Sequence, residues 1–115
     1  MLPARFRLKN KKDFSEVFQR GKTVSNEVLI IKYLKGEGNE LRIGFSAGLK
    51  FSKKSSKRNR VKRWMREAAR ILEGKIKRGH QIIFLINSKF PYEQISYSLV
   101  KEKTGDLLMR AKLFK

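Results

Sequence analysis

Ten lysine and arginine residues lie between Lys50 and Arg70, and Glu67 is the only acidic residue among them. Guanidinium and ammonium groups bind phosphate, and an arginine can do so through two parallel hydrogen bonds. The whole chain of 115 residues has 29 basic and 10 acidic residues, which gives a formal charge of +19. Such a charge excess predicts a polyanionic partner, and the candidates are RNA, DNA and an anionic membrane.

This basic segment also has the apolar spacing of a helix from about 57 to 73. Val61, Trp64, Met65, Ala68 and Leu72 would lie on one side of that helix and face a core. A face that only keeps the protein soluble is the alternative interpretation, but such faces usually mix positive and negative charges. The candidate RNA-binding residues of the segment are Lys53, Lys57, Arg58, Asn59, Arg60, Lys62, Arg63, Arg66 and Arg70.

Residues for protein-based catalysis or metal binding do not form a recognisable motif. His80 is the only histidine and has no acidic neighbour in the sequence, so a structural role is favoured for it. The acidic residues are scattered without a metal-binding spacing, and the chain has no cysteine for thiolate ligands or disulfides. We therefore expect no catalytic residue and no metal held by the protein alone.

The apolar segments are too short to span a membrane, and the N-terminus has no apolar region of the type that directs export. A membrane partner is therefore not expected, although an amphipathic surface helix stays an alternative. The predicted location is the cytoplasm.

The elements that position the basic segment begin with a helix from Lys11 to Arg20, capped by Asn10 and ended by Gly21. Phe14 and Phe18 would lie on one face of this helix. They could belong to the core or frame a groove, and their spacing alone does not distinguish these alternatives.

Two strands are predicted next, at 28–34 and 41–47, joined by a hairpin loop at 35–40. Alternation in the second strand turns Arg42 and Ser46 away from the core. Lys32 and Tyr33 point to opposite faces of the first strand, so only one of them can accompany Arg42.

The remaining elements complete a small α/β domain. Ser55 or Ser56 is the predicted N-cap of the basic helix, 81–86 is a central strand in parallel pairing, and 92–111 is a helix that Gly105 could interrupt. The predicted order is α-β-β-α-β-α, which forms a two-layer α-β sandwich in a single domain, 1–115.

Lys57-Arg58-Asn59-Arg60-Val61-Lys62-Arg63, followed by Arg66-Glu67, resembles the Arg-Asn-Arg signature of the bacterial ribonuclease P protein component. The resemblance covers nearly the whole chain. It includes Arg7-Leu8-Lys9, Asp13-Phe14, Phe18, Gly21, the strand Arg42-Ile43-Gly44-Phe45-Ser46, and Leu107-Leu108 with Ala111.

The resemblance implies a sandwich like the second domain of a small-subunit ribosomal protein, with a left-handed crossover through the basic helix. Periodicity does not predict this handedness, because parallel crossovers are usually right-handed. The family assists a catalytic RNA that removes 5′ leaders from precursor tRNA, so an accessory, noncatalytic subunit of an endoribonuclease is implied.

The implied partners are the catalytic RNA and the leader, with Mg²⁺ bound mainly by the RNA and the protein present as a monomer within the ribonucleoprotein. Phe14 and Phe18 correspond to the leader-binding cleft of the family. The full candidate cleft is Phe14, Phe18, Lys32, Tyr33, Arg42, Ser46 and Lys50.

Two other functions fit the composition. A structural ribosomal protein would bind ribosomal RNA permanently through the same basic surface. A DNA-binding protein would place the basic helix in the major groove, although the sequence lacks the leading helix and tight turn of a helix-turn-helix unit.

Overall fold

The computed structural model describes residues 2–36 and 38–115. It contains four strands, three α-helices and three short 3₁₀ helices in this part of the chain. In chain order they are η1 (Ala4–Phe6), α1 (Lys11–Arg20), β1 (Lys22–Ser25), β2 (Leu29–Lys35), β3 (Arg42–Ser46), α2 (Ser55–Leu72), η2 (Glu73–Lys75), β4 (His80–Ile86), η3 (Tyr92–Gln94) and α3 (Tyr97–Arg110).

The strands form one sheet in the order β1-β2-β4-β3. The central strand β4 pairs in parallel with β3, as predicted, and antiparallel with β2. The predicted hairpin at 35–40 is wrong, because β4 lies between the two strands that this loop connects; Glu37 of the loop lies outside the described residues. β1 was not predicted, since a strand of four residues with three exposed side chains has no core-facing alternation.

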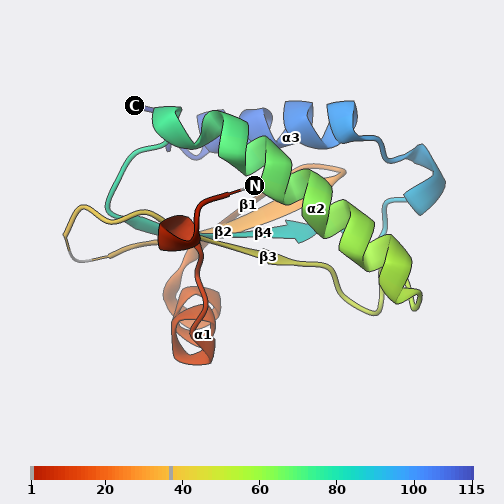
Figure 1. Cartoon of the computed structure of the whole chain (residues 1–115), viewed down its shortest axis with the longest axis horizontal. Coiled ribbons are helices and arrows are strands. Elements are labelled where there is room, and N and C mark those ends of the chain that lie inside the picture. Colours follow the sequence, from red (N-terminus) through yellow and green to blue (C-terminus); the bar gives the residue numbers. More distant parts are fainter. Residues whose placement is uncertain (1, 37) are drawn as a thin grey trace.

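Helix α2 connects the parallel strands β3 and β4 and gives the crossover its hand. In Figure 1, β3 runs toward the right at the near edge of the sheet, α2 returns above the sheet, and β4 runs to the right behind β3. This path is a left-handed crossover, opposite to the usual hand.

The main core lies between the sheet and the layer formed by α2 and α3 (Figure 1). Ile82 and Phe84 of β4 meet Val61 and Met65 of α2 in this core, where all four side chains are fully or almost fully buried. The predicted two-layer α-β sandwich is thus confirmed for the sheet and the α2–α3 layer. Among α-helices and strands, the predicted order α-β-β-α-β-α lacks only β1, and the predicted apolar stripe is the core-facing side of α2. Trp64 and Leu72 are only partly buried, and Ala69 joins the buried side.

Helix α1 packs on the other face of the sheet, where it crosses the strands over one row of paired residues. Gly44, Ile83, Lys32 and Thr23 are neighbours in this row, from β3 to β1. A Cβ atom on Gly44 would collide with Cζ of Phe14, so only glycine allows this ring to rest on the strand.

The helix ends agree in part with the sequence. Asn10 caps α1 by accepting a hydrogen bond from the Lys12 amide at 2.9 Å, as predicted. The predicted serine cap of α2 is wrong: Lys54 is the N-cap and makes no side-chain capping bond. α3 continues through Gly105 without interruption and begins at Tyr97, after a separate turn of 3₁₀ helix.

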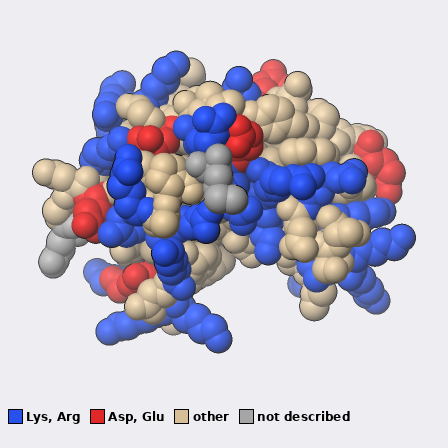
Figure 2. All heavy atoms as spheres, in the orientation of Figure 1, with Lys and Arg blue, Asp and Glu red and all other residues tan. Residues whose placement is uncertain are grey.

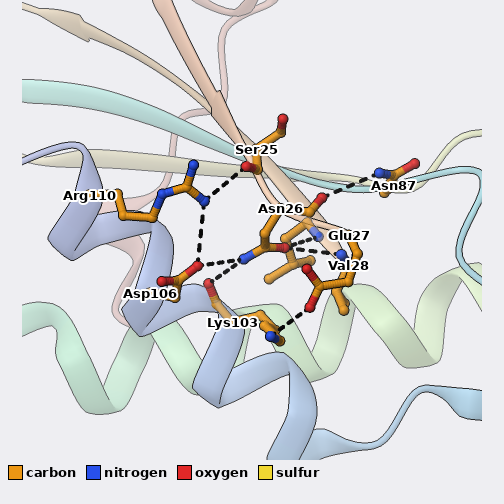
Figure 3. Close-up of polar contacts among 9 residues, drawn as sticks. Ser25, Asn26, Glu27, Val28, Asn87, Lys103, Asp106 and Arg110 are labelled. Atoms are coloured by element: carbon orange, nitrogen blue, oxygen red, sulfur yellow. Dashed lines mark hydrogen bonds and ion pairs between the residues drawn. The ribbon is translucent and has the colours of Figure 1, made fainter.

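A polar cluster fastens the β1–β2 turn to α3 (Figure 3). Asn26 accepts hydrogen bonds from the Val28 and Leu29 amides and donates to the Lys103 carbonyl and the Asp106 carboxylate, at 2.8 to 3.2 Å. We call this cluster the α3 corner; it also includes the ion pairs Glu27–Lys103 (2.6 Å) and Asp106–Arg110 (3.6 Å).

No described helix has both the length and the apolar character needed to cross a membrane.

Candidate nucleic-acid interface

The outward side of α2 is strongly cationic. The apolar stripe of this helix faces the core, so its lysine and arginine side chains face away from the core. Figure 2 shows lysine and arginine side chains spread along the visible side of α2, with few acidic groups near them. The nine predicted RNA-binding residues lie on this helix or just before it, but they differ in what they contact within the protein.

Three of them are held by neighbouring protein groups near the start of α2. Arg58 donates from Nη1 to the Ser52 carbonyl at 2.8 Å and so folds the preceding loop back onto the helix. Lys57 lies with Nζ 4.7 Å from the centre of the Tyr92 ring, and Arg60 donates to the hydroxyl of the same tyrosine at 3.2 Å. These contacts orient the first turn of the helix relative to η3.

Two arginines farther along α2 also have partners. Arg70 forms an ion pair with Glu67, and this hydrogen bond is the main reason that the pKa of Glu67 is lowered and the pKa of Arg70 is raised. The Arg66 guanidinium lies 5.7 Å from the centre of the Phe45 ring, in cation-π geometry.

Asn59, Lys62 and Arg63 have no hydrogen bond or ion pair from their side chains to the described part of the chain. We call these three residues the open basic face. Asn59 and Arg63 are exposed, and Lys62 is half-buried. Their charges and donors are therefore available to a ligand. Lys53, which precedes the helix, is also exposed.

A second candidate surface lies beside α1, on the sheet face opposite the main core. Phe18 is 41% exposed, and Lys32 Nζ lies 5.4 Å from the centre of its ring. The next row of the sheet on this face is Ser46, Leu85 and Ile30, all half-buried. We call these five residues the α1 cleft; it offers an aromatic ring, an apolar floor and one cation.

Other predicted cleft residues lie elsewhere. Tyr33 packs against the main core on the opposite face, so the register places Lys32 and not Tyr33 beside Phe18. Arg42 lies on the far side of α1 from Ser46, where it pairs with Glu40 at 2.7 Å and donates to the Arg5 carbonyl. The structure therefore does not bring Tyr33 or Arg42 into this cleft.

Phe14 and Lys50 border the cleft in different ways. Phe14 rests on Gly44 and packs with the small cluster of Leu8, Val17 and Ile83, so it is mainly structural on this side. Lys50 is exposed in the turn that follows β3, beyond the Ser46 end of the strand.

A groove that the sequence did not predict follows the free edge of β3 between α1 and α2. Its volume is about 170 Å³. We call it the β3-edge groove; its lining residues are Arg7, Leu8, Lys9, Phe14, Ile43, Gly44, Phe45, Lys62 and Arg66. The N-terminal residues were missed because 2–9 has no helical or strand periodicity, and their basic character was the only available signal.

The described residues contain no group of three histidine or acidic side chains that could hold a metal ion. His80 turns Nδ1 to the Arg78 carbonyl at 3.1 Å, which is a local structural contact. The basic and aromatic side chains of this surface can bind phosphate groups and unstacked bases.

Comparisons with known proteins agree with this surface chemistry. Residues 2–112 match the family model described as Ribonuclease P. The Ribonuclease P protein component of Thermotoga petrophila is 33% identical over 108 residues, which are 92% of each chain. That of Alkaliphilus metalliredigens is 37% identical over 97 residues, covering 82% of this chain and 86% of the relative.

Solved structures show the same fold. The RNase P protein from Thermotoga maritima superposes with a TM-score of 0.79 and is 33% identical, covering 90% of this chain and 96% of that one. The Staphylococcus aureus RNase P protein has a TM-score of 0.83 at 23% identity, with 96% and 98% of the chains covered, and supports the fold alone. With its family model matched over nearly all its length, the chain belongs to the ribonuclease P protein component family.

Proposed function

We propose that this chain is the protein subunit of ribonuclease P and that it binds both the catalytic RNA and the 5′ leader of precursor tRNA in the cytoplasm. The observation that carries the proposal is the open basic face, where Asn59, Lys62 and Arg63 have no partner among the described residues. A folded helix that presents unpaired cations along one side is suited to a phosphate backbone.

The α1 cleft is the proposed site for the leader. Phe18 offers an exposed ring on which an unstacked base can lie, and Lys32 places a cation above that ring. Because mature tRNA lacks the leader, contacts in this cleft strengthen binding of the precursor without strengthening binding of the product. One stacked base contributes roughly 1 to 3 kcal/mol, which is enough for a measurable preference.

We assign the cleavage chemistry to the RNA partner. Among the described residues, no group of three histidine or acidic side chains is placed to hold a metal ion. The role of this chain is to neutralise phosphates between two RNA segments, which lowers the Mg²⁺ concentration that the RNA needs for folding and substrate binding.

Cleavage of a 5′-extended precursor tRNA at low Mg²⁺ tests the proposal. A bacterial ribonuclease P RNA is assayed alone and together with this protein, and the protein is assayed without the RNA. We expect correct 5′ cleavage to be stimulated only when both components are present. Cleavage by the protein alone would overturn the assignment of chemistry to the RNA.

Failure of the protein to stimulate a compatible RNA would overturn the proposed subunit role. Co-sedimentation with ribosomal subunits in the same preparation would then favour a structural ribosomal protein of similar surface chemistry.

A further inference from the structure

The β3-edge groove includes Lys62 of the open basic face, and through Phe14 it reaches the helix that borders the α1 cleft. Lys62 and Arg66 enter it from α2, and Phe14 enters it from α1. Phe14 and Phe45 lie on opposite faces of the sheet, so the groove passes around the edge of β3 and not through a cavity on one face.

The free edge of β3 is covered only in part. The Leu8 amide donates to the Ile43 carbonyl at 2.9 Å, and this isolated bridge is where the N-terminal segment meets the strand. Figure 1 shows the N-terminal segment descending across the near side of the sheet to α1. Because backbone groups alternate along a strand, Phe45 turns its amide toward the same edge as Ile43, beyond the covered part.

The charges of the groove are all positive. Arg7, Lys9, Lys62 and Arg66 line it, and its lining includes no acidic side chain. None of these four residues forms an ion pair within the described part of the chain. The nearby acid Asp13 lines an adjacent pocket, whose lining also includes Arg7, Lys9 and Arg42.

Arg7 supplies a second observation. Its Nε atom is buried and has no hydrogen-bond partner in the described part of the chain. A buried guanidinium nitrogen without an acceptor is costly unless the group as a whole is compensated by a nearby anion. Arg7 lines both this groove and the adjacent pocket, and of the two only the groove has no acidic side chain in its lining, so an anion can approach the guanidinium there.

We propose that the β3-edge groove binds one phosphate of the single-stranded leader where the strand passes from α2 to the α1 cleft. Arg7 and Lys9 clamp this phosphate from the N-terminal segment, opposite Lys62 and Arg66 of α2. This assigns a binding role to the N-terminal segment, and it rests on the proposed function because the strand that occupies the groove is the leader.

The choice of a leader phosphate over a peptide or a metal follows from the lining. An acidic peptide would need an apolar floor wide enough for side chains, whereas this groove has a volume of only about 170 Å³ and cations on both of its walls. A cation is excluded by the four positive side chains.

The test uses the assembled holoenzyme and precursor tRNAs in which one leader phosphate at a time is replaced by a neutral methylphosphonate. With the unaltered protein, replacement at one leader position should weaken binding of the precursor tRNA to the holoenzyme. The same replacement should reduce the salt slope, which is the steepness of the fall of log association constant with log salt concentration, by about 0.7, the value for one phosphate of a single strand. With Lys9→Gln, replacement at that position should cause little further loss, while losses at other positions persist.

Lys9 is exposed, so Lys9→Gln should fold, and Arg7→Gln repeats the test with the partly buried partner. Lys101→Gln, which removes one exposed charge from α3, is the matched control and should keep the wild-type profile. If the loss of affinity at each substituted leader position is the same in Lys9→Gln and Arg7→Gln as in the unaltered protein, the proposed clamp is wrong.

Mature tRNA separates the possible failures. If the unaltered holoenzyme binds precursor and mature tRNA equally, the proposed leader function fails and the clamp fails with it. If leader preference is present but Lys9→Gln weakens precursor and mature tRNA to the same extent, the groove binds the catalytic RNA instead and the inference is wrong.

Discussion

The α3 corner and the open basic face both consist of polar side chains, on the β1–β2 turn and α3 in the first region and on α2 in the second, but their partners differ. At the corner, Asn26 makes four hydrogen bonds and Glu27 is paired with Lys103. On α2, Asn59 and Arg63 have no side-chain partner in the described residues. The same residue types thus stabilise the fold where acceptors surround them, and stay available for a ligand where the protein supplies no acceptor.

The strongest test of this difference is the same substitution in both regions. Asn26→Ala should lower the free energy of unfolding by about 2 to 4 kcal/mol, since it removes four hydrogen bonds and leaves partly buried backbone amides unpaired. Urea denaturation followed by circular dichroism measures it, and RNA affinity of the folded fraction should not change.

Asn59→Ala is the matched change on α2. It should raise the free energy of unfolding by about 0.5 kcal/mol, because alanine is the better helix former, while weakening binding to the catalytic RNA. Equal losses of stability in the two variants would contradict the distinction between the corner and the open basic face.

The α1 cleft provides a test that depends on the substrate. Phe18→Ala should weaken precursor tRNA binding by roughly 1 to 3 kcal/mol and leave mature tRNA binding unchanged, since only the precursor has a base to stack on this ring. Competition binding of the two RNAs to the holoenzyme measures the ratio. Met109→Ala truncates another exposed apolar side chain, on α3, and serves as the control; a ratio unaffected by Phe18→Ala would remove this ring from the leader site.

A charge substitution sharpens the comparison further. Arg63→Gln should weaken binding to the catalytic RNA and lower the salt slope of this binding by roughly 0.7 to 0.9, with stability unchanged within about 0.5 kcal/mol. Arg110→Gln removes the same charge at the α3 corner, where the guanidinium donates to the Ser25 carbonyl at 3.0 Å, and should leave the salt slope as it was. The interpretation fails if the two variants change the slope alike.

The smallest effect is expected from acid at the α3 corner. Hydrogen bonding to Lys103 lowers the pKa of the Glu27 carboxyl in the folded protein. The folded pKa is therefore below that of the unfolded chain, about 4.3, so the stabilisation is complete above this pH and is lost as pH falls through the folded pKa.

Glu27→Gln should slightly reduce the loss of stability that the protein shows as pH falls. High salt should make the variant and the unaltered protein more alike in this respect, because the carboxyl is exposed. Denaturation midpoints between pH 3 and 6 measure this. Ser25→Ala, which alters no charge at the neighbouring end of β1, should keep the full pH dependence. A curve unchanged by Glu27→Gln would show that this pair does not contribute to stability.

Much of the fold follows from local pattern. The alternation of Arg42 to Ser46 and the apolar spacing of α2 predicted these elements within one or two residues of their observed ends. The hairpin prediction failed because a strand pair is fixed by a third segment, β4, which lies about 40 residues later in the chain. β1 becomes a strand through its pairing with β2, and its own side chains carry little signal.

The site could be predicted in charge but not in geometry. Counting lysines and arginines identified α2, whereas the partners that hold Arg58 and Arg60 lie outside this helix, and the partner of Arg70 lies in the preceding helical turn. Lys32 and Tyr33 could not be distinguished without the register of β2. The groove residues Arg7 and Lys9 became visible only when the N-terminal segment was placed against β3.

The central position of β4 also has a consequence for synthesis of the chain. Neither β2 nor β3 pairs with the other, so the sheet cannot close until Ile86 has been made, about 30 residues after the basic motif at Lys57. At about 5 to 20 residues per second, the cationic segment precedes its fold by roughly 1.5 to 6 s. During that interval the nascent chain is an unfolded polycation among RNA molecules. Nearby RNA would neutralise its charge non-specifically before the folded interface for a specific RNA exists.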